Sequence, residues 1–208
     1  MDIRSFGPLA LTTSAASAVS ICASQSPGAG AIIINGSLAS GGVATVAGAQ
    51  LITLVFGGND TGITFTITGT DSDGRAQTED VTGASAGTAT STKYFKTVTG
   101  ITHTGSVATT LTSGNTIDAV SNTVRPNLST ALTAIGIGVR LVSGTATYKV
   151  QHSYQDGTSS HPTVWFDNTA GAKTASSEAT YSTPIATIRL LISASASGLL
   201  SGNIIQAG

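Results

Sequence analysis

The chain has 208 residues, of which 9% are charged and 40% are hydrophobic, and its formal net charge is −1. Disordered chains combine low hydrophobicity with high net charge, so this composition indicates a folded protein. A net charge near zero also disfavours long-range attraction to nucleic acid or acidic lipid, so neither is an expected partner.

Residues 1–29 are predicted to form an extended N-terminal arm. The stretch has little hydrophobic periodicity, and it ends in the loop-forming sequence at residues 26–30. The mildly apolar segment at residues 9–21 is interrupted by serine and threonine, so no secretory signal is predicted. No apolar run approaches the roughly 18 residues that span a bilayer, and the chain is expected to be made in the cytoplasm.

Short strand signals separated by turns follow the predicted arm. The clearest is the alternation of Ile63, Phe65 and Ile67 with threonines, which has the period of two of a half-buried strand. A turn at residues 71–74 and a returning strand at 76–81 predict a hairpin. The other strands predicted in this part of the chain are at residues 31–34, 50–56, 91–98, 100–104 and 116–124.

The pattern restarts after residues 125–127. Residues 132–142 and 145–154 predict a strand pair around Ser143-Gly144, with a short strand at 163–166. Closing strands are predicted at 185–192 and 199–205. Because no stretch is convincingly helical, the predicted fold class is all-β, with two β-sandwich or jelly-roll-like domains. Their predicted bounds are residues 30–124 and 125–208, after the arm at 1–29.

The sequence from Gly83 to Gly87 matches the G-x-S-x-G pattern of a nucleophile elbow, with Ser85 at its centre. That chemistry needs a sharp turn from a strand into a helix. The residues that follow are rich in β-branched and aromatic types, which favours a strand, so no catalytic residue is predicted and the chain is not expected to be an enzyme.

Asp71, Asp73 and Gly74, with Glu79 and Asp80 nearby, raise the possibility of a calcium loop. An EF-hand loop ends in a glutamate at its twelfth position, and counting from Asp71 that position is a threonine. An Asp-Gly turn between alternating segments is the favoured interpretation.

His103, His152 and His161 have no metal-ligand spacing, and Cys22 is the single cysteine. No metal, cofactor or internal disulfide is therefore predicted. Cys22 is expected to be a small buried residue, and the histidines to occupy surface or hydrogen-bonded polar positions.

Trp165 and Phe166 form the densest aromatic pair, and Tyr148 and Tyr154 are expected to lie close to them. A lone tryptophan in a β domain most often fills the core. A platform that stacks on a sugar or binds a partner protein is the alternative.

Several segments together resemble small structural proteins of tailed-bacteriophage virions, whose last strand often closes with a Gln-Ala-Gly-like tail. The segments that carry the resemblance are residues 63–83, 91–98, 148–152, 165–166, 184–190 and 203–208.

The resemblance implies an all-β component of the virion. A capsid decoration (cement) protein fits best, since such proteins bridge neighbouring capsomers and stabilise the head shell. The implied partners are the major capsid protein and further copies of the chain, as a dimer or a trimer. A tail, neck or fibre-base component is the alternative, and a carbohydrate-binding β-sandwich module is a more distant one. The arm is expected to add a strand to a neighbour's sheet edge.

Overall fold

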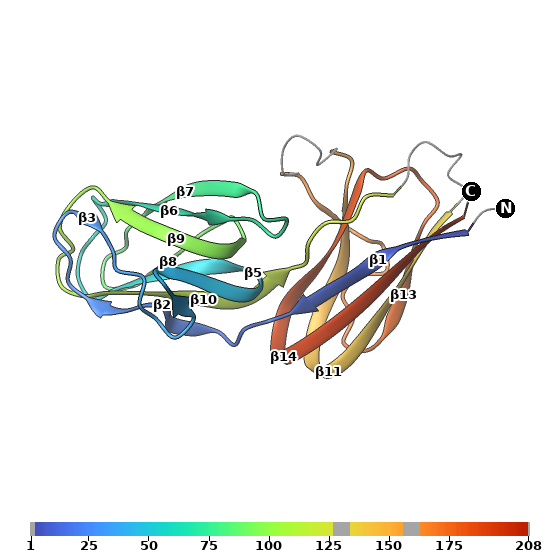
Figure 1. Cartoon of the computed structure of the whole chain (residues 1–208), viewed down its shortest axis with the longest axis horizontal. Coiled ribbons are helices and arrows are strands. Elements are labelled where there is room, and N and C mark those ends of the chain that lie inside the picture. Colours follow the sequence, from blue (N-terminus) through green and yellow to red (C-terminus); the bar gives the residue numbers. More distant parts are fainter. Residues whose placement is uncertain (1–2, 127–133, 156–162, 208) are drawn as a thin grey trace. The chain divides into compact units, whose positions relative to one another are not determined.

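The computed structural model describes residues 3–126, 134–155 and 163–207, and within these residues the chain forms strands and turns without a helix (Figure 1). The predicted all-β class is therefore confirmed. None of the described residues belongs to a helix long and apolar enough to cross a membrane. The chain divides into two compact units: a central unit, Ser14–Ala119, and a terminal unit that combines Met1–Thr13 with Val120–Gly208.

The central unit is built from strands of two to fourteen residues. They are β2 (Ser17–Gln25), β3 (Gly30–Ala31), β4 (Ala39–Ser40), β5 (Val43–Phe56), β6 (Thr64–Thr70), β7 (Ala76–Thr82), β8 (Thr88–Thr90), β9 (Phe95–His103) and β10 (Leu111–Val120), of which β10 ends in the terminal unit.

Strand β5 is shared between two groups of strands. Its first part pairs with β9, with Ala44 opposite Val98, and β9 continues through β6 to β7. Its last part pairs with β8, with Leu54 opposite Ala89, and with β10, which in turn pairs with β2. The change of neighbours follows a register shift between Thr45 and Gln50, the last residue of β5 that pairs with β9. A long strand that changes partners in this way bends the sheet at a corner.

The predicted hairpin is confirmed as β6 and β7, which pair from Thr64 opposite Thr82 to Thr70 opposite Ala76. Phe65 and Ile67 are fully buried, while the intervening Thr66 donates its hydroxyl to Asp80. The core of the unit gathers further buried apolar side chains from β5, β9 and β10, including Ile52, Leu54, Phe95, Ile101 and Leu111.

The irregular part of β5 is stabilised by Lys96. Its ammonium group donates to the carbonyl oxygens of Val46 and Ala47, which the register shift leaves outside the regular ladder. The amide of Ala47 donates to the hydroxyl of Ser14. These bonds occupy backbone groups that would otherwise lose hydrogen bonding at the corner.

Gln50, fully buried at the same corner, joins two distant segments. Its side-chain nitrogen donates to the carbonyl oxygens of Ser14 at 3.0 Å and Thr116 at 2.7 Å. Asn115 extends the network: its amide donates to Ala15 at 3.0 Å, and its oxygen accepts the hydroxyl of Ser20. The network fixes the two segments through which the chain enters and leaves the central unit.

The terminal unit contains the first strand of the chain and the last ones. These are β1 (Ile3–Thr12), β11 (Ala134–Ser153), β12 (Phe166–Asp167), β13 (Ser177–Tyr181) and β14 (Thr187–Ala207), and β13, β11, β14 and β1 lie side by side in that order (Figure 1).

The strand pair predicted around Ser143-Gly144 is wrong. β11 continues through these residues, and both of its halves pair with β14, from Ala134 opposite Ala207 to Ser153 opposite Thr187. Gly144 has a φ of 70°, and register shifts flank Ser143, so the strand bends here without reversing. The two closing strands predicted at 185–192 and 199–205 are likewise one continuous strand, β14.

The two halves of the bent β11–β14 ribbon contact each other. A side chain at Gly202, in the last part of β14, would meet Leu190 from its first part and Leu9 of β1. Both leucines are fully buried, so Gly202 lies where the two halves of the ribbon pack together with β1. A larger residue at this position would separate the layers.

The predicted N-terminal arm at residues 1–29 is not what the structure shows. Within it, β1 pairs with β14 in the terminal unit, and β2 pairs with β10 in the central unit. The cause is burial: Leu9, Leu11, Ile21 and Cys22 are each at most 1% exposed, so both strands contribute to cores. The two-domain division also differs from the predicted one, because the terminal unit includes β1 and its second segment begins at Val120 and not at residue 125.

Replacing Gln50 by leucine should destabilise the central unit by about 2 kcal/mol, because it leaves two backbone carbonyls without donors at a buried site. Urea unfolding followed by circular dichroism measures the change. Gln77→Leu is the matched control, because the Gln77 side chain donates to the carbonyl of Tyr94 at a partly exposed site. Equal losses for the two variants would contradict the structural role assigned to Gln50.

Candidate interaction surface

Three large apolar side chains are exposed together where β11 ends and β12 begins. Tyr154, Val164 and Phe166 are 59%, 48% and 46% exposed. The rings of Tyr154 and Phe166 lie 5.7 Å apart, and the amide of Val164 donates to the side chain of Gln155. We call these three residues the aromatic patch. Clustered apolar exposure of this kind marks contact sites more often than isolated apolar residues do.

His152 lies beneath the aromatic patch because β11 places it opposite Phe166 of β12. Its ring stacks on Phe166 at 5.7 Å and meets the edges of Tyr154 at 5.3 Å and Tyr181 at 4.9 Å. Burial lowers the pKa of His152, so the imidazole is neutral at neutral pH. A neutral histidine in an aromatic cluster packs as a largely apolar ring and supports the patch from below.

Alternate residues of the same strands carry a polar network on the other face of the sheet. Gln151 accepts a hydrogen bond from the Nε of Arg189 and donates to Asp167, each at 2.9 Å. Asp167 also pairs with Lys149 at 2.6 Å. The hydrogen bond from Gln151 and the contact with Lys149 lower the pKa of Asp167 and keep its carboxylate charged.

Trp165 stacks on one member of this polar network, with the guanidinium carbon of Arg189 3.8 Å from a ring centroid. Trp165 is only half-buried, whereas Arg189 is 6% exposed. The favoured prediction of a core tryptophan is therefore wrong: a cationic side chain, and not an apolar core, occupies one of its faces. Stacking between arginine and tryptophan is among the stronger cation–π geometries.

Of the two tyrosines expected near Trp165 and Phe166, the structure brings only Tyr154 into contact with Phe166. Tyr148 is fully buried, and its hydroxyl lies 2.8 Å from both the carbonyl of Ala175 and the hydroxyl of Ser177. It is a core residue that ties β11 to β13 and its preceding loop.

Tyr181 closes the inner side of the aromatic cluster. Burial raises its pKa to about 12, and Asn168 offsets part of the increase. Asn168 is itself fixed, since it donates to the carbonyl of Thr180 and accepts from the amide of Ala170.

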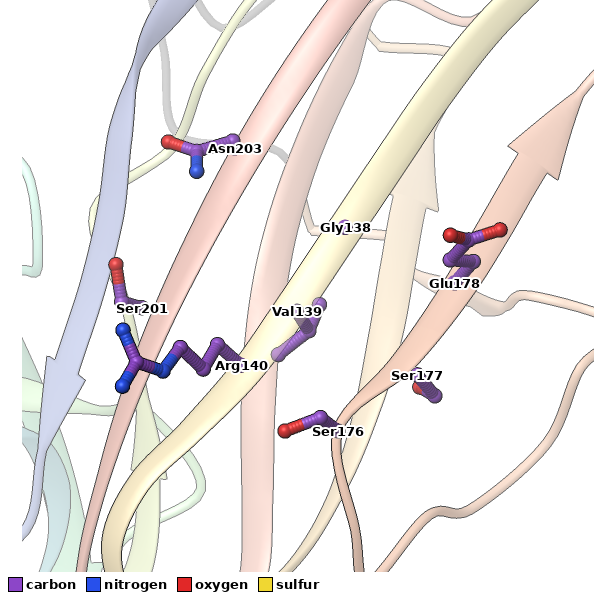
Figure 2. A pocket seen from close by; sticks show the side chains of 8 residues that line it. All are labelled: Gly138, Val139, Arg140, Ser176, Ser177, Glu178, Ser201 and Asn203. Carbon is purple, nitrogen blue, oxygen red and sulfur yellow. The ribbon is translucent and has the colours of Figure 1, made fainter.

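An open groove crosses β13, β11 and β14 elsewhere on the terminal unit. It has a volume of about 340 Å³. Figure 2 shows Gly138 between Glu178 and Asn203, which the strand register places on either side of it. The groove exists because Gly138 has no side chain where its neighbours project. Its lining also includes Arg140, Ser176 and Ser201, so it offers one cation, one anion and several neutral hydrogen-bonding groups.

The turn interpretation of Asp71 is confirmed. Its carboxylate accepts the backbone amides of Asp73 at 2.8 Å and Arg75 at 2.9 Å, and Gly74 has a φ of 79°. The aspartate closes the loop between β6 and β7 as an Asx-turn does. Asp71 is 3% exposed, so its hydrogen bonds are made in a buried position.

Ser85 does not lie on a strand-to-helix turn. It forms an isolated bridge with Asn59, and the next element is the strand β8. His103 Nδ1 contacts the carbonyl of Gly105 at 2.7 Å, and its buried Nε2 makes no hydrogen bond, so it does not pair with the Ser85 hydroxyl.

Metal-ligating side chains do not gather within the part of the chain that the structure describes, since no three of His, Cys, Asp or Glu lie close enough to hold an ion. Cys22 is buried, as predicted, and burial raises the pKa of its thiol. His161, the third histidine considered above, lies outside the described residues.

No protein-family model and no curated protein matches the chain. Among solved structures, the chain is similar to PBSX exported protein XepA at 9% identity, covering 95% of this chain and 86% of that one, with a TM-score of 0.27. It is also similar to allantoicase from Saccharomyces cerevisiae at 10% identity, covering 77% and 76%, with a TM-score of 0.24. Both TM-scores are too low to support a functional inference.

Replacing Asp71 by alanine should destabilise the central unit by about 1–2 kcal/mol, because two backbone amides lose their acceptor. Asp71→Asn, which keeps an acceptor oxygen, should lose clearly less. Thermal unfolding followed by circular dichroism measures both. Adding millimolar calcium should leave the midpoint of the wild-type chain unchanged, and a calcium-dependent rise that Asp71→Ala abolishes would contradict the turn interpretation.

The terminal unit should lose stability in alkali because of Tyr181. Its pKa in the folded protein is about 12, above the ordinary value of 10.0, so the folded state disfavours the phenolate. The stabilisation is complete below about pH 10 and is lost as the pH rises toward about 12, by roughly 2–3 kcal/mol at most. Urea unfolding across this range should show a smaller alkaline loss for Tyr181→Phe than for the control Tyr154→Phe. An identical pH profile for both variants would contradict this assignment.

Proposed function

We propose that the chain is a structural protein of a tailed-phage virion, and within that class a capsid decoration subunit that bridges neighbouring capsomers. The observation that carries the proposal is the aromatic patch of Tyr154, Val164 and Phe166, supported beneath by His152. The resemblance of the strand pattern to virion proteins supplies the class of particle.

The aromatic patch is suited to contact with a protein. Its three members are among the seven large apolar side chains that the described residues expose. Tyrosine and phenylalanine are enriched in the central, desolvated parts of interfaces, where few residues carry most of the binding energy. Complete burial of each side chain would contribute on the order of 1 kcal/mol.

A decoration subunit does not need high affinity at each contact. Many copies on a repeating shell add avidity, so a patch worth a few kcal/mol suffices when each particle offers many equivalent sites. The low charge of the chain fits this setting, since a surface with few charges tolerates close neighbours of the same kind. The proposed partners are the major capsid protein and further copies of this chain.

The geometry of the patch favours protein over carbohydrate. The rings of Tyr154 and Phe166 are inclined to each other by 60°, so they do not form a common plane for a sugar ring. Trp165 is half-buried, and Arg189 occupies one of its faces.

Cryo-electron microscopy of purified virus particles from the source of the sequence tests the proposal. Density for the chain at repeated positions over the head shell would support the decoration role. Density limited to the neck or tail would assign it to the tail, neck or fibre base instead, and absence from the particles would overturn the virion assignment.

The double variant Tyr154→Ser/Phe166→Ser should bind undecorated particles at least about tenfold more weakly than the wild-type chain, equivalent to a loss of about 1.4 kcal/mol. Ile33→Ser is the matched control, because Ile33 is 67% exposed in the central unit and lies outside the patch. Co-sedimentation of the chain with particles gives the affinities, and circular dichroism checks that both variants fold. Unchanged binding of the folded double variant would remove the patch from the interface.

A further inference from the structure

The terminal unit receives one of its strands from the opposite end of the chain. β1 pairs with β14 through eight residue pairs, from Ile3 opposite Ala207 to Thr12 opposite Leu199. Leu9 and Leu11 of β1 are at most 1% exposed, and Leu9 packs over Gly202. The remaining strands of the unit, β11 to β14, follow the whole central unit in sequence.

A short link joins β1 to the central unit. β1 ends at Thr12, β2 begins at Ser17, and no strand is formed between them. Ser14 and Ala15 are hydrogen-bonded to Ala47, Gln50 and Asn115, so the link stays with the central unit. The boundary between the two units falls between Thr13 and Ser14, so β1 would change direction there, although Thr13 is itself buried at 6% exposure.

We propose that β1 is a donor strand that also pairs with β14 of a second copy of this chain, in the register seen here, so that copies exchange their first strands. Residues 3–12 of a neighbouring copy then occupy the edge of β14. The exchange rests on the proposed function for its biological setting, because a multi-copy particle holds neighbours close together.

Exchange of β1 costs little free energy because β1 makes the same contacts with β14 of a second copy as with β14 of its own chain. The backbone ladder and the burial of Leu9 and Leu11 are the same within one chain or between two, so the cost of exchange is confined to rearranging the buried Thr13 and the backbone beside it. Exchange of an identical element is a low-cost route to an oligomer. Concentration then decides between the two forms, since pairing between chains is favoured by mass action.

The outer edge of β1 is unsuited to accepting a further strand. The register shifts between Phe6 and Leu9, and the interruption contains Pro8, which has no backbone N–H to donate. Bulges and prolines protect sheet edges from pairing. β1 is thus a strand that inserts beside β14, and the sheet does not grow beyond it.

Cysteine cross-linking of the full chain separates exchange from pairing within one molecule. Ala10 and Ser201 are opposite each other in the β1–β14 ladder, and Cys22→Ala removes the native thiol. One chain carries Ala10→Cys, and a second chain of different mass carries Ser201→Cys. The two are unfolded together, refolded at several concentrations and oxidised. A chain carrying both substitutions is the control, and its disulfide shows that the geometry permits the bond.

Exchange predicts a covalent heterodimer linked between positions 10 and 201, identified by peptide mass spectrometry. While dimers are the minority, a tenfold rise in protein concentration should raise the dimer-to-monomer ratio about tenfold. A second pair, Ser5→Cys with Ile205→Cys, provides an independent position in the same ladder.

No linked heterodimer at any concentration, with the double-variant control forming its disulfide within one chain, would overturn the proposal. The outcome is independent of the virion assignment. A chain that exchanges strands but is absent from particles would fail the proposed function alone, whereas a chain located on particles without exchange would fail this inference alone.

Discussion

The hydrogen bonds of Gln50 hold together the two segments that connect the central unit to the rest of the chain. Ser14 and Thr116 lie about a hundred positions apart in sequence, yet one buried amide donates to both carbonyls. Because the backbone near these residues continues into β1 and toward Val120, the amide fixes where the first strand and the later strands of the terminal unit depart. A buried polar network of this kind is stabilising only when its members are satisfied, and here Asn115 completes it.

Local signals predicted the local structure well. The β6–β7 hairpin follows from alternating Ile and Thr residues and from the aspartate-glycine turn, and both act over a few residues. The same local signals could not predict the β11–β14 ribbon, because Ser143-Gly144 has the composition of a turn whether the strand reverses or bends. Only the distant partner strand decides between these outcomes. The pairing of β1 was missed for the same reason, since its partner lies at the other end of the sequence.

The aromatic patch was partly predictable from the sequence, and the polar network on the other face of the sheet was not. The proximity of Tyr154 to Phe166 followed from the density of aromatic residues. The contact between Arg189 and Trp165 depends on β14 lying beside β11, which no sequence signal indicated. Alternation of Lys149 and Gln151 with Val150 and His152 was the one available sign that two faces of this strand differ in character.

The terminal unit is built from strands that come before and after the central unit in sequence, and this sets the order in which it is assembled. During synthesis β1 leaves the ribosome before the central unit, and its partner β14 leaves after it. At ordinary elongation rates roughly 10–40 s separate the two events, long enough for the central unit to fold in between. Until then, the apolar residues Leu9 and Leu11 have no sheet to join. A ribosome-bound fragment ending before β14 should therefore expose β1 to proteases or chaperones while the central unit is already resistant.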